Sequence, residues 1–288
     1  MPTVPFPLID VLADDSFEKA HIPGAVNICV YETSFLDNVR KAFPDTSVKL
    51  TVYGWDDSTR EGKLAMDRLH SAGYTDVDLI PGGLSGWKAR GGEIERGEEH
   101  SQRPPTGKYP LDLQKSFIHW TGRNLFGYHD GSLSLSAGGI ALEAGALVGG
   151  QFTIDMRSLR CFDLTDSVMN KMLVTHLLSD DFFSVEEFPT AEFTIASASL
   201  LGGATAGSPN HRIRGSLTLR GIKRTMEFLA LIAENPEGGF TAQASFDIDR
   251  TQWGALYGSG KFFSRLGRHV VNDEVHLHLK IVTAAAEA

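Results

Sequence analysis

Residues 179–193 read Ser-Asp-Asp-Phe-Phe-Ser-Val-Glu-Glu-Phe-Pro-Thr-Ala-Glu-Phe, and this stretch marks a change from helix to strand. Pro189 cannot continue a helix, and Phe193 and Ile195 then alternate with polar residues as in a strand. A lone helix among strands needs an apolar surface, so we expect it to lie across the mouth of a sheet curled on itself. The helix is predicted upstream, with one buried stripe formed by Val168, Met169, Met172, Leu173, His176 and Leu177.

Alternation of apolar and polar residues continues on both sides of this stretch. Paired glycines at 138–139, 149–150 and 202–203 predict turns between the strands. Eight or nine strands with one apolar face each predict an antiparallel barrel, which leaves no exposed edge strand. The strands are expected at 116–122, 132–136, 139–142, 152–156, 192–196, 212–220, 226–232, 240–248 and 275–281.

Several segments of this region carry a family resemblance. They read KSFIHWTGRNLFGYHDGSLSL, GGQFTIDMRSL, LLSDDFFSVEEFPTAEFTI, IRGSLTLRGIKRTMEF and FDIDRTQWGALYGSGKFF with VVNDEVHLHLKI. Over residues 107–284 the chain resembles the YceI-like family, whose members are lipocalin-like barrels, some of which bind a polyisoprenoid chain. The resemblance implies an all-β antiparallel barrel with one inserted helix, and an isoprenoid-type lipid, a quinone or its precursor, held in an apolar tunnel.

The expected tunnel lining consists of large apolar side chains on inward faces. Met169 and Met172 would suit an adaptable gate, because thioethers tolerate varied packing. The alternative is a packed, ligand-free barrel in a chain that acts as a protein-interaction module. No cofactor is required in either case. The expected lining residues are Phe117, Trp120, Phe126, Phe152, Ile154, Met156, Met172, Leu173, Phe182, Phe183, Phe188, Phe193, Phe246, Trp253 and Phe263.

Two groups of polar residues in this region have competing interpretations. Asp249 and Arg250 are expected to end a strand and to hold the following loop by hydrogen bonds, although Arg250 could instead meet the polar head of a ligand. His276 and His278 share a strand face with Lys280, so they should point to solvent. We therefore expect no metal site.

The first hundred residues alternate short strands with helices instead. Strands are expected at 8–11, 26–30, 50–53 and 77–80, and Ser58 and Glu61 have the capping-box spacing for a helix start. This order predicts a parallel sheet with helices on both faces.

These residues resemble the rhodanese family through LIDV, HIPGAVNI and GYTDVDLIPGGLSGWKARGG, in the family's order. Active members carry a persulfide on a cysteine after the central strand, where backbone N–H groups at a helix N-terminus favour a thiolate. This chain has Gly54 at that position, so the resemblance implies a vestigial loop formed by Gly54, Trp55, Asp56, Asp57, Ser58, Thr59 and Arg60.

A glycine cannot carry sulfur, and the acidic loop would repel an anionic sulfur donor. We therefore expect a non-enzymatic domain, a pseudoenzyme that serves as an accessory or protein-binding module. Sulfurtransferase activity through Cys29 is the weakest alternative.

Composition limits the partners. The net charge is −9, and residues 1–100 carry 17 acidic and 10 basic side chains, which disfavours nucleic acid. No apolar run approaches the roughly 20 residues of a membrane span, and two cysteines suit a reducing compartment, so we expect a cytoplasmic protein. The expected organisation is a rhodanese-like domain at 1–98, a linker at 99–106 and a YceI-like barrel at 107–284, with a homodimer left open.

Overall fold

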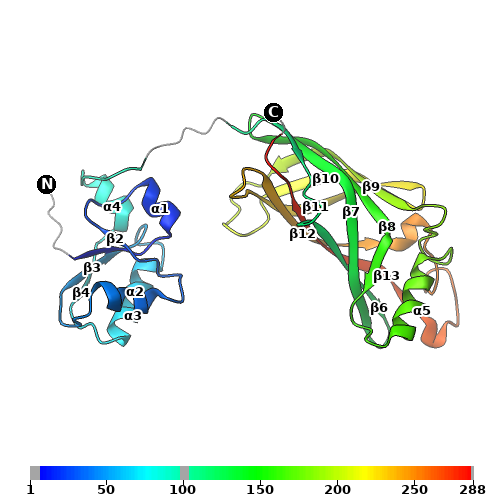
Figure 1. Ribbon diagram of the computed structural model, residues 1–288, viewed down its shortest axis with the longest axis horizontal. Coiled ribbons are helices and arrows are strands. Elements are labelled where there is room, and N and C mark those ends of the chain that lie inside the picture. Colours follow the sequence, from blue (N-terminus) through cyan, green and yellow to red (C-terminus); the bar gives the residue numbers. More distant parts are fainter. Residues whose placement is uncertain (1–6, 98–103, 287–288) are drawn as a thin grey trace. The chain divides into compact units, whose positions relative to one another are not determined.

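The computed structural model describes residues 7–97 and 104–286. The chain divides after residue 101 into two compact units, coloured blue to cyan and green to red in Figure 1. No helix in the described ranges is long and apolar enough to cross a membrane.

The N-terminal unit is a four-stranded parallel sheet covered by helices. Its strands follow the order β2 (Val26–Asn27), β1 (Leu8–Asp10), β3 (Leu50–Tyr53), β4 (Val77–Leu79). Every residue of β1 and β3 is buried, as expected for strands covered on both faces. The helices are α1 (Asp14–Lys19), α2 (Phe35–Ala42), α3 (Glu61–Ser71) and α4 (Gly83–Ala89).

Two apolar clusters lie on opposite faces of this sheet, since alternate residues of a strand point to opposite sides. Ile9 and Val52 pack with α2 and α3, whereas Leu8 and Tyr53 pack with Trp87 of α4. The α/β prediction is therefore confirmed.

The C-terminal unit is an antiparallel barrel closed by eight strands, β6 to β13. Neighbouring strands follow the order β7-β6-β13-β12-β11-β10-β9-β8, and β8 pairs back with β7. The additional strand β5 (Gly107–Pro110) pairs with the second half of β7. The barrel prediction is confirmed; its strands are β6 (Phe117–Asn124), β7 (Tyr128–Glu143), β8 (Ala146–Cys161), β9 (Thr190–Leu200), β10 (His211–Leu219), β11 (Ile222–Glu234), β12 (Phe240–Asp249) and β13 (Val271–Val282).

Two of the expected glycine turns are wrong. The pairs 138–139 and 149–150 lie inside β7 and β8, and a side chain on Gly139 would come within 2.6 Å of the Tyr109 carbonyl oxygen. Glycine therefore permits close strand passage there. The chain reverses at Ala144 and Gly145, whose φ values of 46° and 82° are the left-handed backbone of a tight hairpin.

Helix α5 (Ser167–Leu178) interrupts the strands where it was expected (Figure 1). Its N-cap Asp166 accepts hydrogen bonds from the N–H groups of Val168 and Met169. The half-buried Leu173 and Leu177 pack on a cluster beneath the helix that includes Trp120, Leu159 and Cys161. Two short 3-10 helices, η1 (Arg250–Trp253) and η2 (Gly267–His269), flank the long connection to β13.

Candidate ligand-binding site

Two adjoining cavities lie inside the barrel. The first, which we call the inner cavity, has a volume of about 110 Å³. The second, which we call the helix-side cavity, lies beneath α5 and has a volume of about 260 Å³. They share the wall residues Ile118, Ile154, Leu217 and Leu277, so together they follow the length of the barrel.

The two cavities differ in chemistry. Every residue lining the inner cavity is apolar except Gln243 and Thr283, and the Phe228 ring contacts those of Phe193 and Phe246 there. The helix-side cavity also has an apolar floor but adds polar groups: Arg123, Asn124, His129, His176, Arg250, Tyr257 and Asn272. The combined space therefore suits an amphipathic molecule with an apolar tail.

Nine of the fifteen residues predicted from the sequence line a cavity. They are Trp120, Phe152, Ile154, Met156, Leu173, Phe182, Phe183, Phe193 and Phe246.

The other six line neither cavity, which corrects the expectation. Phe117 lies on the outer face of β6, stacked on His119 at a ring distance of 4.4 Å, because it alternates with the inward Ile118. Phe126, Phe263 and Met172 are exposed to 78%, 48% and 63% in loops or on the outer side of α5.

The last two are packed elsewhere. Phe188 lies against Gly221, where an added Cβ would come within 2.8 Å of its ring. Trp253 is buried in η1, and its indole Nε1 donates a hydrogen bond to the Leu217 carbonyl oxygen at 3.1 Å. Neither side chain is available to a ligand inside the barrel.

Trp120 has an unpaired donor in the site. Its side chain lines the helix-side cavity and is 7% exposed, and its Nε1 has no hydrogen-bond partner among the described residues. A buried N–H without an acceptor costs free energy. A ligand oxygen that accepts a hydrogen bond from this N–H would remove that cost and so favour binding.

Arg250 holds the loop beside this cavity. The guanidinium is 1% exposed and donates to the carbonyl oxygens of Asn272 at 3.1 Å, Val271 at 3.2 Å and Ala255. It also lies 5.3 Å over the Phe182 ring. Burial lowers the pKa of Arg250, while the charges of nearby aspartates oppose that shift. The prediction that this residue stabilises the loop is confirmed.

A groove adjoins the helix-side cavity where the pairing of β6 with β13 is irregular. Val271 pairs with Asn124 and Val275 with Gly122, so the register shifts between these two pairs. The groove has a volume of about 360 Å³ and shares Asn124, Val271 and Asn272 with the cavity. The groove and the helix-side cavity therefore lie side by side at this irregularity in the β6–β13 pairing.

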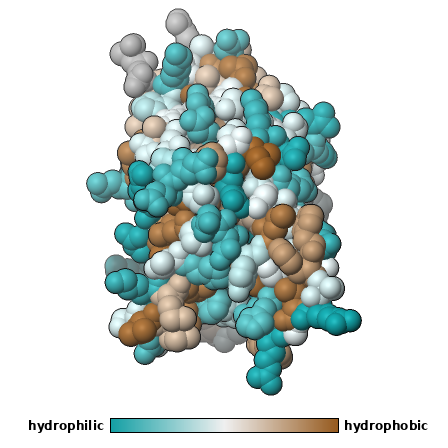
Figure 2. Space-filling view, turned by 90° about the vertical axis from the view of Figure 1, so that its right-hand side faces the viewer, coloured by the Kyte–Doolittle hydropathy of each residue, from teal (hydrophilic) through white to brown (hydrophobic). Residues whose placement is uncertain are grey.

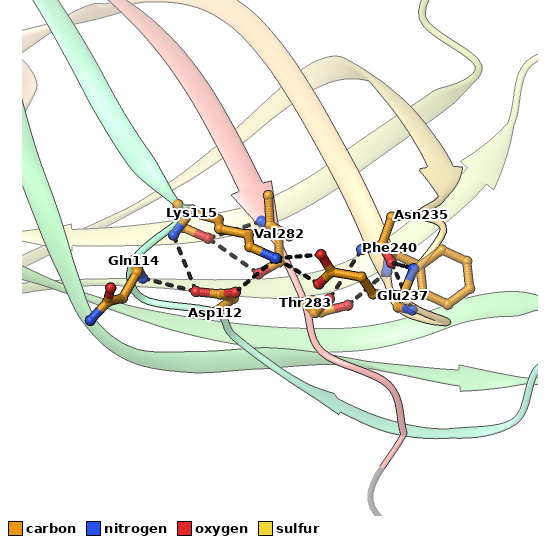
Figure 3. Close-up of polar contacts among 10 residues, drawn as sticks. Asp112, Gln114, Lys115, Asn235, Glu237, Phe240, Val282 and Thr283 are labelled. Carbon is orange, nitrogen blue, oxygen red and sulfur yellow. Dashed lines mark hydrogen bonds and ion pairs between the residues drawn. The ribbon is translucent and has the colours of Figure 1, made fainter.

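The opposite end of the barrel is tied together by polar contacts (Figure 3). Lys115 Nζ lies 2.6 Å from the Glu237 carboxylate and 3.7 Å from that of Asp112. Asn235 Nδ2 donates to the Thr283 carbonyl oxygen at 3.1 Å, and the Thr283 hydroxyl accepts from the Phe240 N–H at 2.9 Å. Phe240 and Thr283 also line the inner cavity, so this network lies at that end of it.

Sequence reasoning missed part of the wall. Met226, Phe228 and Ile232 line the inner cavity from β11, and His129 and Tyr257 line the helix-side cavity. Alternation in β11 carried the signal for the first three. Nothing local marks His129 or Tyr257, because their neighbours in the cavity come from distant strands.

The loop after β3 in the N-terminal unit contains no sulfur atom. A Cβ on Gly54 would lie 2.5 Å from Glu61 Cγ and 2.9 Å from the Gly62 nitrogen. The Glu61 carboxylate accepts hydrogen bonds from the Trp55 N–H at 2.9 Å and the Thr59 hydroxyl at 2.7 Å. A carboxylate thus accepts the backbone N–H that directly follows Gly54.

The capping box expected at the start of α3 is wrong. The N-cap residue is Arg60, and the Ser58 hydroxyl donates to Asp56 at 2.6 Å rather than accepting from the helix. Cys29, the alternative nucleophile, is half-buried.

Comparisons with known proteins agree with this division. A model described as YceI-like domain matches residues 109–283, and one described as Rhodanese-like domain matches residues 2–90. No curated protein matches the chain.

Among solved structures, BcnA of Burkholderia cenocepacia is 23% identical, with 60% of this chain and 98% of that chain covered and a TM-score of 0.47. A polyisoprenoid binding domain from Saccharophagus degradans is 14% identical, with 63% and 99% covered and a TM-score of 0.46. The Rhodanese_3 like domain of the Anabaena sp. Alr3790 protein is 30% identical, with 34% and 99% covered and a TM-score of 0.30. The chain therefore belongs to the YceI-like family through its barrel, which follows a rhodanese-like domain.

Proposed function

We propose that the barrel binds an isoprenoid-type lipid, a quinone or its precursor, as a non-enzymatic carrier or sensor. The observation that carries the proposal is the pair of adjoining cavities, one walled almost wholly by apolar side chains and the other mixed. Burial of an apolar tail contributes about 25 cal/mol per Å² without requiring polar partners.

The lining sets the direction of the ligand. The tail occupies the inner cavity, whose far end is lined by Phe240 and Thr283. A polar head then lies in the helix-side cavity, where the unpaired Trp120 Nε1 donates to an oxygen such as a quinone carbonyl. The groove between β6 and β13 is the passage for the ligand.

Lipid extraction of the purified protein followed by mass spectrometry tests this proposal. We expect one isoprenoid-type lipid per chain, and reduced occupancy in Ala244→Leu, which adds volume to the wall of the inner cavity. Ser245→Leu is the matched control, since Ser245 is the next residue of β12 and bonds His278 on the outer face. A lipid-free protein that also fails to take up a short-chain isoprenoid quinone would end the proposal.

We further propose that the rhodanese-like domain is an accessory module that binds a protein partner instead of transferring sulfur. Glu61 occupies the space beside Gly54, and Trp55 on the same loop is 50% exposed. An assay of cyanide-dependent thiosulfate consumption that exceeds the buffer rate would contradict the proposal. Loss of activity in Cys29→Ser would then identify Cys29 as the nucleophile.

A further inference from the structure

We propose that His129, Cys161 and Asp163 form a Zn²⁺-type metal site at the rim of the helix-side cavity. One ligand atom from each residue lies within 4.8 Å of the others, and within the described ranges this is the one such group of three. The proposal does not depend on a bound lipid.

The barrel topology brings the three side chains together. Cys161 ends β8 opposite Gly131 of β7, and His129 lies two residues earlier on the same inward face of β7. Asp163 follows the end of β8. Gly131 is required at this crossing, since an added Cβ would approach the Arg160 carbonyl oxygen to 1.7 Å.

Hydrogen bonds hold the group in place. The Asp163 carboxylate accepts from His129 Nδ1 at 2.8 Å, from the Asp130 N–H at 3.1 Å and from Cys161 Sγ at 3.2 Å. Asn170 Nδ2 donates to the Cys161 carbonyl oxygen at 3.0 Å, which ties the turn to α5. The metal-ligating atoms are therefore held close together without a bound ion.

The ligand types select the metal. One imidazole nitrogen, one thiolate sulfur and one carboxylate oxygen suit Zn²⁺ or a related transition metal, whereas Ca²⁺ and Mg²⁺ prefer oxygen alone. Binding exchanges the thiol proton for the metal, and the thiolate and carboxylate charges balance the ion. Three protein ligands leave a fourth position open to water or to a group in the cavity that His129 lines.

The competing explanation is that the three side chains only stabilise the end of β8 by hydrogen bonds and bind no metal. Titration of the chelator-treated full chain with Co²⁺ distinguishes the metal site from a hydrogen-bonded cluster. A Co²⁺–thiolate bond gives a charge-transfer absorption, and a cluster that binds no metal gives none. We expect one equivalent to bind and Zn²⁺ to displace it.

Variants assign the ligands. Cys161→Ser should abolish the thiolate absorption, and His129→Gln and Asp163→Asn should weaken binding by more than about tenfold. Two variants serve as controls. Cys29→Ser removes the other cysteine, and His276→Gln removes a histidine whose Nδ1 lies 2.9 Å from the Asp247 carboxylate in a pair that has no thiol. Both controls should bind as the parent does. A folded parent without the absorption, or an unchanged absorption in Cys161→Ser, overturns the proposal.

Discussion

Two tryptophans of the barrel differ in one atom's surroundings. Trp120 Nε1 is buried without a partner at the helix-side cavity, whereas Trp253 Nε1 donates to the Leu217 carbonyl oxygen. Both were predicted to line the ligand site, because the sequence does not show where an indole nitrogen points. They form a matched pair for separating binding from stability.

Trp120→Phe should weaken lipid binding while sparing the fold. Relief of an unsatisfied donor, which costs about 1–3 kcal/mol, offsets the lost ring volume, so the free energy of unfolding should change by about 1 kcal/mol or less. Affinity for a short-chain isoprenoid quinone should fall about tenfold through the lost hydrogen bond. Fluorescence titration and urea unfolding measure the two quantities.

The reverse is expected of Trp253→Phe. It removes the hydrogen bond that the indole donates to the Leu217 carbonyl oxygen, so the free energy of unfolding should fall by about 1–2 kcal/mol with affinity unchanged. Equal losses of affinity in the two variants would contradict a role for the Trp120 N–H.

Gly54→Cys should not restore sulfur transfer. The new Cβ would overlap Glu61 Cγ and the backbone nitrogen of Gly62, so we expect a lower melting temperature and a thiosulfate:cyanide rate equal to buffer. Adding Glu61→Ala removes the first overlap but leaves the backbone one, and should recover only part of the stability. Turnover by the single variant would show that the loop still cradles a persulfide.

His211 makes the barrel sensitive to acid. Burial lowers the pKa of His211 below its ordinary value of 6.5. The unfolded chain therefore takes up a proton first, and the free energy of unfolding falls as the pH drops through 6.5 toward the folded pKa. His211→Gln should lose less stability than the parent over this range, measured by urea unfolding at each pH.

At the scale of elements, the periodicity of apolar residues predicted where α5 lies in the chain but not which of its side chains are buried. Its helical spacing predicted its place in the chain, but the expected single buried stripe is wrong. Val168, Met169 and Met172 are exposed to 67%, 51% and 63%, and Figure 2, which looks onto this side of the barrel, shows hydrophobic side chains exposed among hydrophilic ones. The six stripe residues span too much of the helix circumference for one face, and only contacts with the barrel decide which part is covered.

Because Leu173 lines the cavity and Met172 is exposed, substitution of these adjacent residues of α5 should have different effects on lipid binding. Leu173→Ser places a hydroxyl in the wall of the helix-side cavity and should reduce lipid occupancy severalfold. Met172→Ser changes an exposed side chain and should leave occupancy and melting temperature unchanged. Native mass spectrometry after loading with the quinone measures occupancy; a loss in Met172→Ser would restore the gate role expected for that methionine.

Strand glycines were misinterpreted for a similar reason. A glycine pair predicts a turn when only local sequence is considered. The carbonyl oxygen that excludes a side chain at Gly139 belongs to Tyr109, far away in the sequence. Alternation of apolar residues, which is local, therefore predicted the barrel, whereas close strand passage could not be predicted.

At the scale of the molecule, the two-part organisation was predictable because the pattern of apolar residues differs between the two halves of the chain. The presence of cavities inside the barrel was not predictable from this pattern. Whether inward side chains fill a barrel depends on the sum of their volumes against its radius, and the radius depends on the register of all the strands together. The same argument explains why the His129, Cys161 and Asp163 group escaped notice, since barrel closure brings β7 and β8 together.

We propose domain boundaries at residues 98 and 107, and they predict how the barrel behaves alone. A chain of residues 107–284 keeps β5, which pairs with Gly139–Leu142 of β7, and should retain the melting temperature of the full chain's barrel transition and its bound lipid. A chain beginning at residue 112 loses β5 and leaves that edge of β7 without hydrogen-bond partners, so its melting temperature should fall by several degrees. Calorimetry of both chains beside the parent measures this. Equal melting temperatures for the two truncated chains would place the boundary after β5, and loss of lipid from both would mean that the barrel needs the rhodanese-like domain to hold its ligand.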